Sequence, residues 1–449
     1  MCASSAPPGS AGAVPDRSFW MRPGLEVRGG RLLIAGRDAE TLAREHGTPL
    51  YVFDLQRVAE MARDLQGALT RAGLRARVRL AMKAQREPEL LRFIRGLGAP
   101  GTPESVGLDV CSPREVLHGL AHAWLPEEIS YTGTNVSERD LDVLLAHPIQ
   151  INLDLLSQIE RVGRRAPGRA IGIRLNPRAG AAWGGARHTH YSMSDKPTKF
   201  GIYAEQLEDA VAAARRHDLQ IVTAHFHVGD GFLNDGLVAY DIAVAKATAM
   251  ISRLIELGCP IREVNTGGGL GIPLLPGEEH LDLDAYAAIL AKHLGPLDVL
   301  VTTEPGDFLT KESGILLAEV VTVEDRLGKT FVGLDAGWNI MHDRFIYDVP
   351  FEVALCRAVD AAPAWHVTIA GHINEGNDLF AEDYPFPTVD EGDVVAIINC
   401  GGYNQAMTLE HCLRPPAAAV YFDDRLAAAE DTVHQAGEDH AKGGVTHGP

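Results

Sequence analysis

Eight short apolar runs, rich in β-branched residues, recur between residues 78 and 303 of the 449-residue chain. Segments with the 3.6-residue period of amphipathic helices separate them, for example 205–217 and 240–257. Strands that alternate with helices predict a parallel sheet, and eight strands can close into a (β/α)8 barrel of the TIM type. The runs are Val78–Lys83, Gly107–Cys111, Ile129–Thr132, Ile149–Leu153, Ala170–Leu175, Ile221–His227, Glu263–Thr266 and Val299–Thr303.

Polar residues and glycines follow these runs. In a barrel the carboxyl ends of all the strands meet on one face, and active sites lie there. We therefore expect the side chains at these ends to share a site. They are Lys83, Ser112, Asn135, Asp154, Asn176, His227, the glycines at 267–269 and Glu304.

The pattern changes after Leu309, where short strands are separated by Gly, Asp and Pro and helices become scarce. This pattern predicts a mostly antiparallel β-domain that the N-terminal strands could complete. We expect a disordered lead over 1–20, a β-domain built from 21–45 and 306–424, a barrel over 46–305 and a flexible tail over 425–449.

The net charge of −19 argues against a nucleic-acid partner and against an anionic membrane surface. No apolar run approaches the roughly 20 residues of a membrane span. The six cysteines are scattered without a CxxC pair. This spacing predicts reduced thiols in the cytoplasm and no metal site.

Lys83 stands at the end of an apolar strand, after Leu80, Ala81 and Met82. An ammonium group is costly to bury unless it is paired or used chemically. Desolvation lowers the pKa of a lysine, as covalent catalysis through a Schiff base requires. From this stretch alone, a strand-end lysine that reaches solvent is the plainer interpretation.

Six sequence motifs that occur in a common order favour a catalytic Lys83 over a lysine that only reaches solvent. From about Pro49 to Pro416 the chain resembles the pyridoxal-phosphate (PLP) decarboxylases of the diaminopimelate, ornithine and lysine type, which share the barrel of alanine racemase. Each motif is weak alone, and their common order makes the resemblance specific. The motifs are Ala-Met-Lys83-Ala, His227-Val-Gly229, Gly267-Gly-Gly-Leu-Gly271, Glu304-Pro-Gly306, Glu375-Gly-Asn-Asp378 and Gly401-Gly-Tyr403.

The resemblance implies that Lys83 binds PLP covalently and later returns a proton to the substrate. Glu304 would face the pyridine nitrogen, which must stay protonated for the cofactor to act as an electron sink, and His227 would pack on the ring. Without a ligand, these would be an ordinary surface glutamate and a core histidine. The phosphate would lie at a glycine-rich turn, which alone is also compatible with an empty tight turn. The other implied cofactor residues are Gly229, Gly267, Gly268, Gly269, Gly271, Gly306 and Tyr403.

Two departures from the family pattern concern the substrate. Asp307 and Asp343 stand where diaminopimelate decarboxylases carry arginines for the distal carboxylate, while Tyr347 is retained. Two aspartates would disfavour a distal carboxylate, so we expect a lysine-like or ornithine-like substrate with a basic or neutral far end. Arg344 could restore carboxylate binding if the alignment shifts by one residue, and meso-diaminopimelate is then the alternative substrate.

A third departure concerns protonation. The family's cysteine is replaced by Asn374, which cannot act as an acid, so Lys83, water or His372 would have to do so. Decarboxylative transamination is therefore an alternative outcome.

The resemblance also implies a homodimer with shared sites, in which Glu375 and Asp378 serve the partner's pocket. Asp230 stands where the family has a serine near the phosphate, and the sequence offers no account of it.

Two other classes of function remain open at this point. Some relatives of this fold have given up PLP and act as binding proteins, and retention of Lys83, His227, Glu304 and Tyr403 argues against that role. Racemisation would need a second base on the opposite face of the cofactor, for which the sequence offers no clear candidate.

Overall fold

The computed structural model describes residues 19–183, 197–424 and 434–436. The predicted lead over 1–20 and tail over 425–449 lie outside these residues, except for 19–20 and 434–436. The contacts divide the chain into two compact units, which we call the barrel unit and the β unit. The barrel unit comprises Ala59–Ile272 and Glu279–Leu309, and the β unit comprises Met1–Val58, Pro273–Glu278 and Thr310–Pro449.

Eight strands of the barrel unit close into a ring in the order β11-β13-β14-β5-β6-β7-β8-β9. All eight neighbouring pairs are parallel, so the predicted (β/α)8 barrel is confirmed. Each predicted run overlaps one strand. The strands are β5 (Ala76–Ala81), β6 (Gly107–Val110), β7 (Ile129–Gly133), β8 (Gln150–Leu153), β9 (Ala170–Leu175), β11 (Gln220–Phe226), β13 (Glu263–Asn265) and β14 (Leu300–Thr303).

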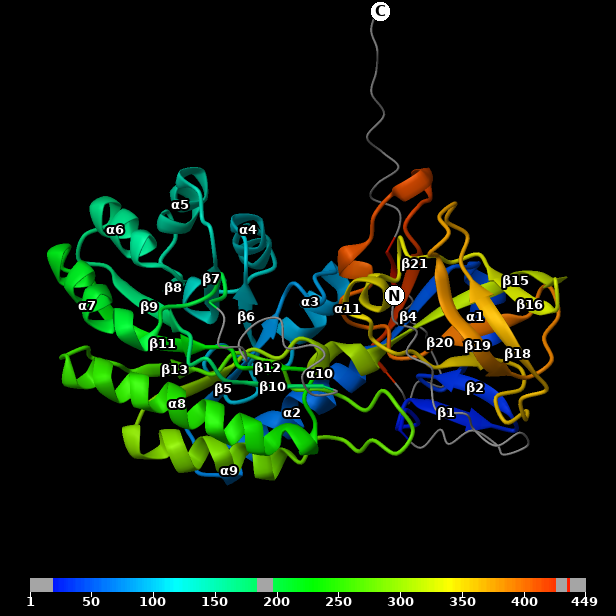
Figure 1. The fold of residues 1–449 in the computed structure, drawn as a ribbon, viewed down its shortest axis with the longest axis horizontal. Helices are drawn as coiled ribbons and strands as arrows, with labels where there is room; N and C mark the ends of the chain where they lie inside the picture. Colours follow the sequence, from blue (N-terminus) through cyan, green and yellow to red (C-terminus); the bar gives the residue numbers. More distant parts are fainter. Residues whose placement is uncertain (1–18, 184–196, 425–433, 437–449) are drawn as a thin grey trace, which may run out of the picture. The chain divides into compact units, whose positions relative to one another are not determined.

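Helices lie outside the ring of strands (Figure 1). Capping side chains fix where several of them begin: Ser112 accepts a hydrogen bond from the Glu115 N–H at 3.2 Å, and Asp282 caps another helix in the same way. Among the described residues, no helix is long and apolar enough to cross a membrane. The helices are α2 (Leu55–Arg71), α3 (Pro88–Arg95), α4 (Pro113–Ala121), α5 (Glu138–Leu145), α6 (Leu156–Arg165), α7 (Leu207–Arg216), α8 (Leu237–Glu256), α9 (Leu283–Leu294) and α10 (Asp307–Thr310).

The β unit is built around a nine-stranded sheet. Most of its pairs are antiparallel, while β4–β21 and β16–β18 are parallel. Its apolar faces pack on α1 (Ala39–His46) and on a small sheet of β1 (Leu25–Arg28), β2 (Arg31–Ile34) and β3 (Arg37–Asp38). The sheet contains β4 (Leu50–Asp54), β15 (Gly314–Arg326), β16 (Lys329–Leu334), β17 (Val353–Leu355), β18 (Trp365–Ala370), β19 (Leu379–Phe386), β20 (Val394–Ile397), β21 (Ala418–Phe422) and β22 (His434–Ala436).

Strand β4 pairs with β15 on one side and with β21 on the other. The sequence analysis placed this strand in the barrel range of 46–305, and that boundary was wrong by one strand. An apolar strand followed by a helix fits either unit, because only its pairing partners distinguish the two. One further helix, α11 (His342–Tyr347), belongs to the β unit.

Candidate active site

Lys83 follows β5 at the carboxyl end of the barrel strands. The residues before it are buried, whereas Lys83 itself is exposed. Two backbone hydrogen bonds hold this stretch: Ala81 N–H donates to the Pro305 carbonyl at 3.2 Å, and Met82 N–H donates to the Asp109 carbonyl at 2.9 Å. The exposed lysine therefore follows a backbone that is held in place, and its bond to a cofactor stays a prediction.

Glu304 lies at the end of β14 and is 6% exposed. It accepts hydrogen bonds from Asn265 and from His225 Nε2, the latter at 3.2 Å. Burial raises the pKa of Glu304, but the hydrogen bond and charge of His225, with the charge of Arg79, outweigh it and hold the pKa below its usual value. Glu304 is therefore a buried, ionised carboxylate.

Asp109, near the end of strand β6, holds its proton, whereas Glu304 does not. Burial, followed by the negative charge of Glu304, raises its pKa well above the usual value. The two carboxyl groups share one barrel interior, so the negative charge stays on Glu304, which has the better donors.

His227 is a neutral imidazole with a defined tautomer. Burial and then the positive charge of Lys83 lower the pKa of His227 well below its usual value. The backbone N–H of Gly268 donates to Nδ1 at 3.1 Å, so the ring proton lies on Nε2. A neutral ring can pack on an aromatic cofactor without placing a second positive charge beside Lys83.

The glycines at 267–271 form a turn in which the backbone approaches other backbone too closely for side chains. Gly269 has φ +96°, and a Cβ there would lie 2.1 Å from the Gly229 carbonyl carbon. A Cβ on Gly268 would lie 2.3 Å from the Glu304 carbonyl oxygen. This cradle joins β13, β14 and the His227-Val-Gly229 segment, and a glycine-rich turn of this kind can hold a phosphate through its backbone N–H groups.

Sequence reasoning missed three members of this constellation, His225, Asn265 and Asp109. His225 lies two residues before His227, so the two side chains leave the chain on the same face. The contact of His225 with Glu304 places this face inside the barrel. Inward parity within the predicted strands is the signal that would have found all three. The same parity places Arg79 inside the barrel, where it pairs with Glu263 at 2.6 Å.

Other polar residues at the strand ends serve local structure. Ser112 is the cap of α4, Asp154 accepts from the Gly201 N–H, and Asn176 donates to the Phe200 carbonyl at 2.7 Å. Gly306 accepts from the Leu309 N–H at 3.1 Å, next to Asp307 at the start of α10. Asp230 is exposed on a two-residue strand, and its carbonyl accepts from the Trp183 N–H at 2.9 Å.

The β unit brings two predicted tyrosines together. Tyr403 follows the Gly401-Gly402 turn with φ +57°, a left-handed conformation rare outside glycine. Its ring meets the Tyr347 ring edge-on, with 6.4 Å between centroids. Asp343, in the same helix as Tyr347, forms a buried ion pair with Lys311, and Arg344 pairs with Asp348.

The segment 372–378 contains the predicted protonation and partner-site residues. Burial, with the positive charge of Arg414, lowers the pKa of His372 to about 4, so at neutral pH this ring is a neutral imidazole and a poor acid. Asn374 and Glu375 are exposed, and Glu375 lies 3.4 Å from His411. Asp378 is buried and accepts from the N–H groups of Trp338 and Ile373 at 2.8 and 2.7 Å. Its contact with a substrate stays a prediction.

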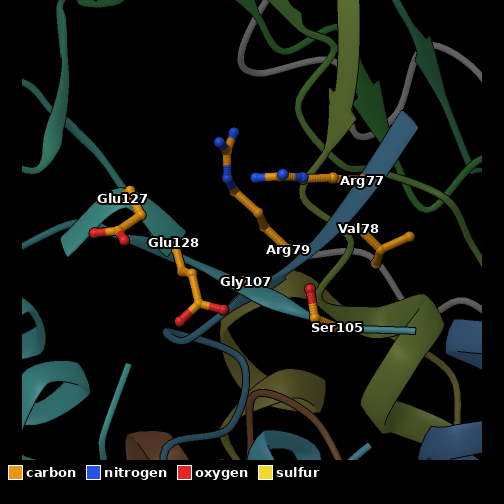
Figure 2. Close-up of a pocket in the computed structure, with 7 residues that line it drawn as sticks. All are labelled: Arg77, Val78, Arg79, Ser105, Gly107, Glu127 and Glu128. Atoms are coloured by element: carbon orange, nitrogen blue, oxygen red, sulfur yellow. The ribbon is translucent and has the colours of Figure 1, made fainter. Parts of the chain in front are cut away.

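A hollow at the opposite, amino-terminal end of the barrel strands is separate from this constellation. Figure 2 shows Arg77 and Arg79 of β5 extending to one side of it, with Glu127 and Glu128 across from them. Its volume of about 10 Å³ suits one water molecule. A wider cavity of about 610 Å³ shares Arg79 and Glu127 with it. No predicted cofactor residue lines either space.

A barrel with a strand-end lysine, an ionised buried carboxylate and a glycine cradle defines the class of enzymes that hold PLP on a TIM-type barrel. Residues 55–311 match the family described as "Pyridoxal-dependent decarboxylase, pyridoxal binding domain", which is more than half of the chain. The chain belongs to this family and is a PLP-dependent carboxy-lyase.

Curated relatives and solved structures agree with this assignment. Diaminopimelate decarboxylase of Methanothermobacter thermautotrophicus is 33% identical over 89% of this chain and 92% of the relative. The Escherichia coli K12 enzyme of the same name is 28% identical, over 88% and 95%. The crystal structure of Helicobacter pylori diaminopimelate decarboxylase complexed with L-lysine has a TM-score of 0.77 at 25% identity, covering 88% of this chain and 95% of that chain.

Proposed function

We propose that this chain removes the α-carboxylate of a lysine-type amino acid, and that meso-diaminopimelate is its substrate. The observation that carries the decarboxylation is the constellation of Lys83, ionised Glu304 and the glycine cradle at one end of the barrel. Support for diaminopimelate comes from the relatives that carry this name, which match over nearly their whole length. Diaminopimelate was the alternative in the sequence analysis, and these relatives favour it over the lysine-like substrate preferred there.

The proposed roles follow from the site. When bound, PLP supplies an electron sink for the electron pair left at the α-carbon as CO2 departs. Lys83 attaches the cofactor and returns a proton to the α-carbon, and Glu304 keeps the ring nitrogen protonated. His227 packs on the ring as a neutral imidazole. The backbone at 267–271 holds the phosphate, and the role of Tyr403 at the cofactor stays the prediction that the resemblance implies.

A second candidate substrate is an amino acid without a distal carboxylate, such as lysine or ornithine. Asp307 favours such a substrate, because a carboxylate next to the Glu304-Pro-Gly306 turn repels the distal carboxylate of diaminopimelate. Asp343 favours it less, because Lys311 offsets its charge. Both candidates keep the same reaction at the α-carbon.

The test is CO2 release from meso-diaminopimelate, lysine and ornithine with purified protein and added PLP. We expect release from diaminopimelate with the highest kcat/KM, and no release from any substrate by Lys83→Ala. Lys292→Ala is the matched control, because Lys292 is an exposed lysine paired with Asp241 on the barrel's outer helices. Faster turnover of lysine or ornithine would select the second candidate.

Mass analysis of the product tests the protonation step. Asn374 supplies no acid, and His372 is neutral at neutral pH, so we assign the proton at the α-carbon to Lys83. The expected product is an amine with the nitrogen retained. A carbonyl product together with the aminated cofactor would show decarboxylative transamination, and no turnover of any substrate would favour a binding protein.

A further inference from the structure

The β unit contains a buried ion pair, and the sequence analysis assigns one of its members, Asp343, to substrate binding. Lys311 and Asp343 are each 2% exposed, and their ammonium and carboxylate groups are in contact. We infer that Lys311, Asp343 and Asn404 form a positioning network that holds Tyr403 against Tyr347, and that Asp343 does not read the substrate's distal group. The inference rests on the proposed function only for the role of Tyr403 at the cofactor.

The contacts of this network form a closed ring. The Lys311 side chain pairs with Asp343, whose backbone N–H donates to Asn404 Oδ1 at 3.0 Å. Asn404 Nδ2 donates to the Gly402 carbonyl at 3.2 Å, and the Gly401 N–H donates to the Lys311 carbonyl at 3.0 Å. The chain from Gly401 to Asn404 is therefore fastened at both ends, with Tyr403 between them.

The ring also fixes the helix that carries Tyr347. Asp343 lies in the first turn of α11, and Tyr347 lies one turn later on the same helix. Just before the helix, the Tyr51 hydroxyl donates to the Ile340 carbonyl at 2.5 Å. The edge-on contact of the two tyrosine rings thus joins two segments that the network already holds.

The turn at Gly401-Gly402 is closely packed against the backbone and side chains around it. A Cβ on Gly401 would lie 2.0 Å from the Thr310 carbonyl oxygen and 2.7 Å from Ser313 Oγ. The left-handed φ of Tyr403 persists because its surroundings over-determine it. Removing a member of the network would release this conformation.

Charge explains why Asp343 is a positioning residue. A buried carboxylate is stable when an opposite charge and hydrogen bonds satisfy it, and breaking such a pair leaves an uncompensated buried charge. The Lys311 ammonium offsets the negative charge of Asp343 inside the β unit. The pair therefore contributes little net field to the substrate, and it does not attract a cationic distal group.

The first experiment measures stability. Lys311→Met and Asp343→Leu should each lower Tm by roughly 10 °C, because each leaves one buried charge alone. The double variant Lys311→Met/Asp343→Leu should lose less than either single variant. Lys292→Met, which removes an exposed lysine, is the control and should move Tm by about 1 °C or less. Additive losses in the double variant would overturn the buried pair.

The second experiment separates positioning from substrate reading. In Asp343→Asn we expect PLP to bind about tenfold more weakly, measured by its visible absorbance in a titration. The ratio of KM values for lysine and diaminopimelate should stay within about twofold of the wild-type ratio. A rise of tenfold or more in the KM for lysine alone would show that Asp343 reads a cationic end, and would overturn the inference.

The two proposals fail in different ways. If the wild-type protein decarboxylates none of the substrates, the proposed function fails, while the Tm coupling and the PLP titration still decide the network. If decarboxylation is confirmed but Lys311→Met and Asp343→Asn bind PLP with wild-type affinity, the positioning network fails alone.

Discussion

At the scale of single residues, two buried carboxyl groups of the barrel interior, Glu304 and Asp109, differ in their protonation state. Glu304 has donors from His225 and Asn265, whereas burial beside Glu304 raises the pKa of Asp109. A low-dielectric interior that holds one negative charge disfavours a second one. The charge therefore lies where the proposed ring nitrogen needs it.

Exchanging each carboxyl group for its amide tests this assignment. Glu304→Gln removes the charge that keeps the ring nitrogen protonated, and kcat should fall about 100-fold or more. Asp109→Asn is the matched control, because it replaces a group that is already neutral, and kcat should fall less than about fivefold. Steady-state decarboxylation rates measure both. Equal losses in the two variants would contradict the assignment of the proton to Asp109.

At the scale of elements, the glycine cradle depends on close approach of three segments. Gly269 combines a positive φ with backbone at a distance that no side chain tolerates, and Gly229 is its partner across the gap. The cradle is thus a packing feature of the β13–β14 region as well as a place for a phosphate. Its glycines are needed for space, and only some of them for conformational freedom.

Gly269→Ala is expected to disrupt this packing. The new methyl group would clash with the Gly229 backbone and strain φ, at a cost of about 2–4 kcal/mol in the free energy of unfolding. PLP affinity should fall as well. Gly295→Ala is the control, because nothing lies within 4 Å of the place where its Cβ would be and its φ is ordinary. Urea denaturation and PLP titration measure the two effects, and wild-type values for Gly269→Ala would refute the cradle.

At the scale of the whole molecule, three separate segments of the chain make up the β unit. Strand β4, before the barrel, lies between β15 and β21, which come after it. The barrel is thus inserted between strands of one sheet. The homodimer, in which Glu375 and Asp378 would serve the partner's site, stays a prediction.

Complementation between inactive variants tests the shared site. Lys83→Ala mixed with Glu375→Ala should form heterodimers that each hold one intact site, giving about a quarter of wild-type activity after random exchange. Lys83→Ala mixed with Glu304→Gln is the control, because both residues belong to the barrel unit and each site keeps a defect. Recovery in neither mixture would contradict sites shared through Glu375.

The sequence by itself determined the barrel and the position of Lys83. Strand and helix periods are local properties, and the alternation of eight runs leaves few folds that bury them. Lys83 and Glu304 stand at strand ends, so their common location follows from the barrel alone.

Only the tertiary structure decided which groups touch. His225, Asn265 and Glu304 come from three strands, and their contact depends on the register of β11, β13 and β14. Asp343 looked like an open carboxylate in the sequence, and packing in the β unit gave it Lys311. Pairing between distant elements, and the desolvation that sets each charge, arise only when the chain is folded.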